Sequence, residues 1–461
     1  MAKSTALTLK QRVFKAGAWT AAGYVVSQTI RFGSNLLMTR LLVPEMFGVM
    51  SIASMVMYGL ALMSDVGLGP NVIYSKRGND ALFLNTAWAI QIRRGALIWC
   101  FALGVGILIT VANRIGVVPA ASVYAKQQLP YVIAILSFGA VISGFESTKI
   151  FEASRNLLIH RLTQIEISSQ VAGLLCMLAW VAIDRSIWSL VAGSICSTLV
   201  RVILSHVRLP GHANRWQWDD KAFREIIHFG KWIFLSSILG FLINSGDRIL
   251  LGGMLSATAL GVYAIAFLIT SSVENVIGKI ISDVSFPALS EVLRDRPAQL
   301  KASYYRFYVI IASFAYLVAG FLMVSGQALI GLIYDNRYNQ AGWMLEILAV
   351  ALIALPFRLA PYCFQALGMP RLLSSIIAIR LITLFLVTPI GFHFFGLRGA
   401  LWSVVLSGFA GLPLTIFYAV KYRLFDLWNE LKLLPLVPAG VVLGKLFDLA
   451  VAYWWPHSGR L

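Results

Sequence analysis

Apolar segments of about twenty residues recur along the whole chain, and they constrain its fold more than any other feature. Segments of this length are typical of membrane-spanning helices, whereas the strands of a membrane barrel show about ten residues of alternating polarity. Only 13% of the residues are charged, against roughly a quarter in soluble proteins. The sequence therefore predicts an all-α, multi-pass membrane protein.

Windows of about twenty residues divide the chain into about twelve transmembrane helices. The first window has spanning length and lacks the small-residue ending of a cleaved signal peptide, so we predict that it is a transmembrane helix. The predicted spans are 14–38, 45–67, 95–113, 128–148, 164–183, 187–206, 228–252, 258–282, 307–326, 343–366, 373–395 and 397–420. After them, 423–432 reads as a surface helix, and the apolar stretch 435–455 is either an additional C-terminal span or part of a surface hairpin.

Lysine and arginine are distributed very unevenly between the two sides of this topology. With the N-terminus placed in the cytoplasm, most basic residues of the loops fall on the cytoplasmic side. The opposite side holds only Arg40, Arg114, Lys126, Arg185, Arg337 and Arg398. The net charge of +18 thus follows from membrane orientation, and no nucleic-acid partner is expected.

The second half of the chain repeats the first at an offset of 213 residues. Gly17-Ala18-Trp19 corresponds to Gly230-Lys231-Trp232, and Phe47-Gly48-Val49 corresponds to Leu260-Gly261-Val262. Because the offset covers six spans, the two halves have the same orientation, as in transporters whose bundles rock about a central site. We predict an N-terminal six-helix lobe at 1–206, a cytoplasmic linker at 207–227, a C-terminal six-helix lobe at 228–422 and a tail at 423–461.

Several short motifs carry a family resemblance across the whole chain. They are Gly17–Trp19, Thr39–Gly48, Asp65–Gly69, Asn244–Arg248, Leu260–Tyr263 and Phe286–Ser290. In their order and spacing they resemble the polysaccharide-export (Wzx-like oligosaccharide flippase) branch of the multidrug/oligosaccharidyl-lipid/polysaccharide exporter superfamily. One departure concerns Glu152-Ala-Ser-Arg155-Asn156, where such proteins often carry paired basic residues, so a phosphate contact there is not expected.

The resemblance implies a flippase of the bacterial inner membrane that moves a polyprenyl-diphosphate-linked oligosaccharide from the cytoplasmic to the periplasmic leaflet. It implies a role in making a surface or extracellular polysaccharide, with membrane lipids and polymerase or export machinery as partners. A transporter of this type is not an enzyme. The four cysteines lie in apolar segments without metal-site spacing, and no nucleotide-binding motif occurs, so we expect no metal, cofactor or ATP.

Charged groups inside a span cost about 2.5 to 3.5 kcal/mol at its centre, so each needs a partner or a role. Arg31 lies halfway along the first span, and its turn corresponds in the repeat to Asn244, with Asp247 and Arg248 one turn further. We predict a path for the anionic head group between the first and seventh spans, with Arg31 and Arg248 as substrate-binding residues and Asn244 and Asp247 as polar or coupling groups. The structural alternative is that these charges pair within the helix bundle.

Two further basic residues are candidates for binding the substrate near the ends of spans. Lys231 either recruits the diphosphate or extends to the cytoplasmic surface. Arg358 lies between Pro356 and Pro361, which should break the tenth span, and a broken helix at a charged residue suggests a gate or a site.

Charges deeper in the second half complete the predicted site. Arg380 either pairs with Glu166, which occupies the corresponding place in the repeat, or lines the substrate path. Glu274 is a candidate for proton coupling. Arg93, Arg94 and Arg306 match each other in the repeat, and we predict that they lie at the cytoplasmic mouth, either binding substrate or anchoring the span boundary.

Energetics and loop lengths separate this function from its alternatives. An inside-negative potential of 100 mV would favour outward movement of two negative charges by about 4.6 kcal/mol, so an H+ or Na+ coupling ion is compatible but not required. Multidrug or cation efflux would need an acidic cavity. A membrane-embedded glycan polymerase or ligase would need a large outer loop with catalytic groups, and the loop at 113–127 has neither carboxylate nor histidine. A non-transporting scaffold would not need the repeat or the buried arginines.

Overall fold

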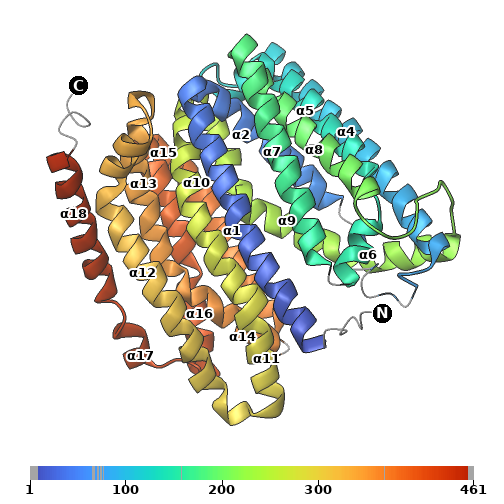
Figure 1. Ribbon diagram of the computed structural model, residues 1–461. Helices are drawn as coiled ribbons and strands as arrows, with labels where there is room; N and C mark the ends of the chain where they lie inside the picture. The colour runs from blue at the N-terminus through green and yellow to red at the C-terminus, as the bar shows by residue number, and fades with distance from the viewer. Residues whose placement is uncertain are drawn as a thin grey trace. The chain divides into compact units, whose positions relative to one another are not determined.

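The computed structural model describes residues 9–64, 68–69, 72, 75, 77–156, 158–367 and 369–454. Side chains at 9–18, 20–21, 63, 228–236, 370, 427 and 431 lie outside this description, as do Asp65–Gly67 of the third motif. The described residues form helices joined by short connections, and none of them lies in a β-strand (Figure 1). The predicted all-α class is confirmed.

The chain divides into two compact units, Met1–Phe241 and Leu242–Leu461. The division falls inside one long helix, α9, and the predicted lobe boundaries at 206 and 228 stay predictions. Unit 1 contains α1 (Leu9–Leu41), α2 (Pro44–Met63), α4 (Ala81–Ile115), the 3-10 turn Val123–Ala125, α5 (Gln128–Gly144), α6 (Lys149–Arg155), α7 (Ile159–Ile183), α8 (Trp188–Val207) and the first part of α9 (Asp220–Met254).

Unit 2 contains the rest of α9 and a series of long helices interrupted by tighter or wider turns. Its elements are α10 (Ala257–Lys279), a π-helical turn (Ile280–Ser285), α11 (Phe286–Asp295), α12 (Leu300–Ile333), α13 (Gln340–Val350), 3-10 turns at Ala351–Ala354 and Pro356–Arg358, α14 (Leu359–Ala366), α15 (Pro370–Ala410), α16 (Leu412–Lys421), α17 (Leu427–Leu431) and α18 (Leu436–Trp454). Short 3-10 turns, Pro297–Gln299 and Asn336–Tyr338, connect α11 to α12 and α12 to α13.

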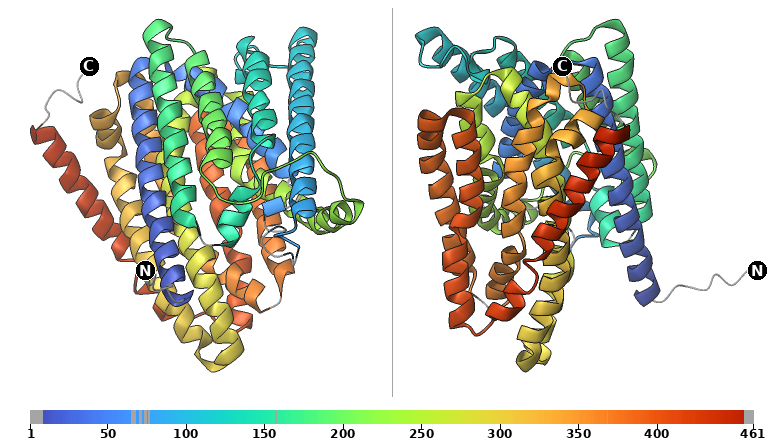
Figure 2. Two further views of the ribbon diagram at one scale, coloured as in Figure 1. Left: turned by 45° about the vertical axis from the view of Figure 1, so that its right-hand side comes forward. Right: turned by 90° about the vertical axis from the view of Figure 1, so that its left-hand side faces the viewer.

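Each predicted span has a helical counterpart among the described residues. Eight helices are long and apolar enough to cross a membrane, and two bent pairs raise that number to ten; one of the ten is α18 of the tail, so nine correspond to predicted spans. α15 is itself a hairpin of two arms: Gly396 has φ 60°, and a side chain on Gly391 would come within 2.7 Å of the Gly399 carbonyl oxygen on the returning arm (Figure 2). The remaining two spans correspond to α1 and α9, which have 33 and 35 residues.

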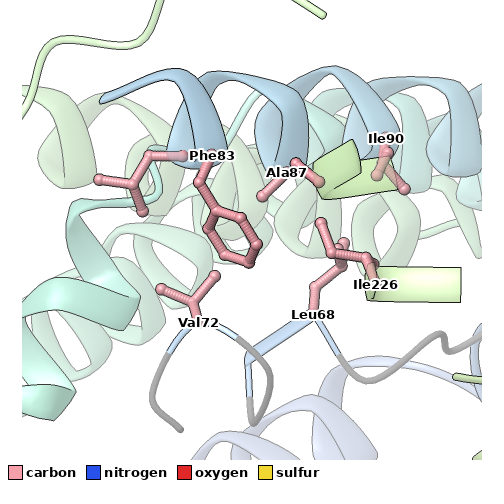
Figure 3. Close-up of a cluster of buried hydrophobic side chains, with 8 residues drawn as sticks. Leu68, Val72, Phe83, Ala87, Ile90 and Ile226 are labelled. Atoms are coloured by element: carbon pink, nitrogen blue, oxygen red, sulfur yellow. The ribbon is translucent and has the colours of Figure 1, made fainter. Parts of the chain in front are cut away.

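The third predicted span begins earlier than hydropathy suggested. Asp80 caps α4 by accepting a hydrogen bond from the Leu82 amide at 3.1 Å, so the helix begins at Ala81, fourteen residues before the predicted start at 95. Phe83, Ala87 and Ile90 on this first part of α4 pack with Leu68, Val72 and Ile226 in a buried cluster (Figure 3). The start of α4 is therefore buried against protein, which hydropathy windows for lipid-embedded helices do not detect.

The tenth span is broken, as its prolines predicted. The α-helical pattern of α13 gives way to two 3-10 turns before α14 begins, and the two parts of the span meet at 40°. Pro356 cannot donate a backbone hydrogen bond, which explains the break at this position. Arg358 ends the second 3-10 turn.

The apolar tail stretch forms α18, which has the length and hydropathy of a span and lies along α12 (Figures 1 and 2). Three glycines form the contact: a Cβ at Gly440 would overlap the Leu317 carbonyl oxygen, and one at Gly444 would lie 2.7 Å from that of Phe321. Gly320 on α12 is equally crowded, since a Cβ there would lie 2.9 Å from the Val441 nitrogen. Small residues at this spacing are typical of helix contacts in membranes, and they favour the additional span over a surface hairpin.

Candidate functional site

A cavity of about 230 Å³ within unit 2 gathers several of the charged residues singled out from the sequence. Its walls come from the end of α9, from α10, from the broken span and from the two arms of α15 with α16. Its polar lining consists of Asn244, Glu274, Arg358, Tyr362, Arg380 and Thr415. The structure thus brings together four predicted site residues that lie up to 136 positions apart, from Asn244 to Arg380.

Arg358 is held at the cavity by the broken helix and by an ion pair. Its Nη1 donates to Glu274 Oε2 at 3.0 Å, and both side chains are about one-third exposed. The break after Ala354 turns the chain by 40°, so that the 3-10 turn carrying Arg358 lines the cavity together with Glu274 of α10. Glu274 therefore fixes the position of Arg358.

Arg380 lines the same cavity without a comparable partner. Its Nε is buried, and among the described residues no acceptor lies within hydrogen-bonding distance of that atom. Gly411, on the far side of the hairpin, makes room for it: a Cβ there would come within 3.3 Å of Arg380 Cγ and 2.8 Å of Ile376 Cγ2. The lining contains two guanidinium groups and one carboxylate, so the cavity has an excess of positive charge.

Asp247 and Arg248 have structural partners instead. The Tyr263 hydroxyl of α10 donates to Asp247 Oδ2, and Asp247 is only 6% exposed. The Arg248 guanidinium lies 4.8 Å from the centre of the Phe267 ring, and its Nη2 donates to the Asn244 carbonyl oxygen at 2.8 Å. The contacts with Tyr263 and Phe267 join α9 to α10, and the bond to Asn244 lies within α9. Arg248 Nε is buried without an acceptor among the described residues, and the role of this pair in binding substrate stays a prediction.

In unit 1 the predicted mouth residues also have local partners. Arg94 donates to the Ala61 carbonyl oxygen at 2.6 Å and to Ser64 Oγ at 3.1 Å, and it lines a second cavity of about 390 Å³ with Gln91. The Arg93 guanidinium stacks on the Trp218 ring at 4.1 Å. Arg31 and Arg306 are exposed on α1 and α12, and the side chain of Lys231 lies outside the described residues.

Glu166 has hydrogen-bond partners within unit 1. It accepts from Arg201 Nη1 and from Gln170 Nε2, and Arg201 Nε also donates to Glu146. This network joins α7, α8 and the connection after α5 within unit 1, and no pattern in the sequence singled out Arg201 as its centre. Arg380 lines the cavity of unit 2, and its role as a substrate ligand stays a prediction.

Loop charges form a further group that sequence reasoning missed. Arg77 Nη2 lies 2.9 Å from both Asp80 Oδ2 and Asp219 Oδ2. The hydrogen bond from Arg77 lowers the pKa of Asp219, and the bonds to Asp219 and Asp80 raise the pKa of Arg77. Arg155 donates to the carbonyl oxygens of Val72 and Ser75 at 3.0 and 2.7 Å.

The arrangement can now be compared with known proteins. The family described as polysaccharide biosynthesis protein matches residues 37–342, which is more than half of the chain. The chain belongs to this family. The resemblance to the polysaccharide-export branch, seen in the sequence motifs, is thereby confirmed.

Individual relatives are distant but cover much of the chain. The lipopolysaccharide biosynthesis protein WzxC of Escherichia coli is 21% identical over 75% of this chain and 68% of its own length. A putative O-antigen transporter of Shigella flexneri is 21% identical over 85% of this chain and 94% of its own. Among solved structures, the lipid II flippase MurJ in an inward closed conformation aligns with a TM-score of 0.63 at 12% identity, over 95% of this chain and 99% of its own. This chain thus shares its multi-pass helical fold with the lipid II flippase MurJ.

Proposed function

We propose that this protein is a flippase that moves a polyprenyl-diphosphate-linked oligosaccharide from the cytoplasmic to the periplasmic leaflet by alternating access. Its family membership, together with relatives named for lipopolysaccharide biosynthesis and O-antigen transport, supports a role in polysaccharide export. In this proposal the protein lies in a bacterial inner membrane with its N-terminus in the cytoplasm, and it makes and breaks no covalent bond of its cargo.

The observation that carries the substrate class is the positive cavity of unit 2. Arg358 and Arg380 supply planar donor arrays that stay charged at any physiological pH and can bind phosphate oxygens in pairs. A buried guanidinium nitrogen without a protein acceptor is costly, and a phosphate oxygen would satisfy it. A transporter of cationic drugs would be repelled by this charge, so the same cavity argues against the efflux alternative.

The roles of the lining residues follow from their contacts. We assign Arg380 to direct contact with the diphosphate, because its Nε has no acceptor among the described residues. Arg358 is the second phosphate ligand, and Glu274 holds it in place through the 3.0 Å ion pair. Asn244 lines the cavity beside them, while Arg31, Arg306 and Lys231 remain proposed substrate contacts outside it.

Deletion of the gene tests the function, because cells without a flippase should accumulate the diphosphate-linked glycan on the cytoplasmic leaflet and export no polymer. Complementation with Arg380→Gln then tests the site. A lost charged hydrogen bond costs about 1.5 to 3 kcal/mol, which corresponds to a loss of export of roughly 10- to 150-fold at limiting substrate.

Arg185→Gln is the matched control, since Arg185 is exposed in the connection between α7 and α8. It should export polymer at the wild-type rate. If Arg380→Gln exports within twofold of wild type at equal protein level, the cavity is not the head-group site. If the deletion strain accumulates no lipid-linked glycan while polymer is lost, the flippase function itself is wrong.

A further inference from the structure

Besides its 390 Å³ cavity, unit 1 has a larger groove of about 650 Å³, and the lining of this groove differs in kind from that of the unit 2 cavity. Most of its wall is apolar, contributed by Leu60 of α2, by Ile90, Leu97 and Phe101 of α4, and by Phe223 and Ile227 of α9. Leu97 and Phe101 are 55% and 64% exposed, so this wall opens to the surroundings of the helices. In a membrane protein such an open apolar wall faces lipid chains.

The polar part of the groove is small and purely basic. Arg93 and Arg94 line it together with Ser64 and Trp218, and no carboxylate lines it among the described residues. Three acids of the linker lie outside this lining: Asp219 binds Arg77, Asp220 accepts from Nε1 of the groove residue Trp218 at 2.8 Å, and Glu225 accepts from Ser75 Oγ at 2.8 Å. The positive charge at this place is therefore not neutralised within the groove.

Arg93 is held in an orientation suited to binding an anion. Its guanidinium lies over the Trp218 ring at 4.1 Å and near the Trp216 ring at 5.6 Å. Stacking uses the face of the guanidinium and leaves its in-plane N–H groups for acceptors. No described residue accepts a hydrogen bond from Arg93, which is exposed. The neighbouring Arg94, fixed on Ala61 and Ser64, adds a second positive charge.

The spacing along α4 places a charged end and an apolar end in line. Phe101 follows Arg93 by eight residues, so the apolar wall extends about 12 Å beyond the guanidinium along the helix. We propose that this groove binds an anionic phospholipid of the surrounding leaflet, with its phosphate on Arg93 and one acyl chain along Leu97 and Phe101. A phospholipid is favoured over the glycan-bearing cargo because the lining offers almost no polar side chains for sugars.

This lipid would also fasten the linker to unit 1. Trp216 and Trp218 come from the segment before α9, and Phe223 and Ile227 come from its first turns. Arg93 of α4 already stacks on Trp218 of this segment, and a lipid bound in the groove would contact both elements. The site is separate from the proposed cargo cavity, so its loss and the loss of flippase function can be told apart.

Native mass spectrometry of the purified full-length protein tests the proposal, with phosphatidylglycerol as the probe and phosphatidylcholine as the zwitterionic comparison. We expect phosphatidylglycerol to bind more tightly than phosphatidylcholine, and Arg93→Gln to weaken phosphatidylglycerol binding about tenfold, as loss of one charged hydrogen bond predicts. Arg114→Gln is the matched control, because Arg114 is exposed in the last turn of the same helix. It should change binding less than twofold.

Three outcomes would overturn the assignment. The first is equal binding of the two phospholipids by the wild-type protein. The second is phosphatidylglycerol binding by Arg93→Gln within twofold of wild type. The third is displacement of phosphatidylglycerol by polyprenyl phosphate at equimolar concentration, which would make the groove part of the cargo route. Should Arg93→Gln fold poorly, Leu97→Asn tests the acyl-chain wall independently, with the same expected loss.

Discussion

The contact between α12 and α18 gives a quantitative test of the fold. At Gly440 an added Cβ would overlap the carbonyl oxygen of Leu317 and lie 3.0 Å from the Phe321 nitrogen. Both are backbone atoms, so no side-chain rotation can relieve the overlap, and the two helices must move apart. Gly440→Ala should therefore destabilise the protein, even though alanine is the better helix former by about 1 kcal/mol.

The magnitude follows from a matched substitution at Gly104, in the interior of α4, where an added Cβ meets nothing within 4 Å. Gly104→Ala should be neutral or stabilise by about 0.5 to 1 kcal/mol, because only the helix preference changes. The preference is the same at both positions and cancels in the comparison. The difference in unfolding free energy between the two variants then equals the overpacking cost, about 1 to 3 kcal/mol.

Unfolding of each variant in mixed micelles with increasing dodecyl sulfate, followed by tryptophan fluorescence, measures this difference. Gly440→Ala should be less stable than Gly104→Ala by this amount. If Gly440→Ala is as stable as Gly104→Ala, then α18 does not pack on α12 through its glycines.

Three further predictions concern charged and polar groups. Tyr263→Phe should lower stability by about 1 to 3 kcal/mol, because it leaves the buried Asp247 carboxylate without its donor, and should leave cargo affinity unchanged in a binding assay on the folded fraction. Glu274→Gln should weaken cargo binding only when Arg358 is present, because Glu274 acts by holding Arg358 in place. A double-mutant cycle with Arg358→Gln should therefore give a coupling energy of about 0.5 to 1 kcal/mol for this partly exposed pair. Additive effects of the two substitutions would contradict this positioning role. Arg77 lowers the pKa of Asp219, so the stabilisation from this pair is complete above the ordinary aspartate pKa and is lost as pH falls through the lowered value. Protection of the amides at 219–223 against hydrogen exchange, relative to their intrinsic exchange rate at each pH, should fall below about pH 4, and Asp219→Asn should show the same loss of protection at neutral pH.

The length of the apolar segments was sufficient to predict most of the helices, because a span in lipid must be long and apolar throughout. It was insufficient where a helix is buried against protein. The first turns of α4 carry Asn85, Thr86 and Gln91, which are unsuited to lipid, and each of them has a hydrogen-bond partner in the structure. The polar linker was read as a loop up to 227 for the same reason, whereas α9 begins at Asp220.

The candidate site shows a different limit. Sequence could identify Arg358 through its prolines and Arg380 through its depth, because both signals are local. It could not show that Glu274 pairs with Arg358 or that Glu166 pairs with Arg201, since these partners depend on how distant helices face one another. A charged residue in a span indicates either a structural partner or a function, and only the packing of the helices distinguishes the two.

Arg248 and Arg380 illustrate this distinction. Arg248 belongs to a motif of the family resemblance, and its guanidinium contacts the Phe267 ring and the Asn244 carbonyl oxygen, beside the Asp247 carboxylate that accepts from Tyr263. Arg380 belongs to no motif. Each of the two arginines has a buried Nε without an acceptor among the described residues, but only Arg380 lines the unit 2 cavity. Removing Arg248 would therefore reduce export mainly by disturbing the packing of α9 on α10, so a loss of export in that variant alone does not identify a ligand of the head group. A variant that keeps its stability and loses transport would identify such a ligand, and we propose Arg380 for that position.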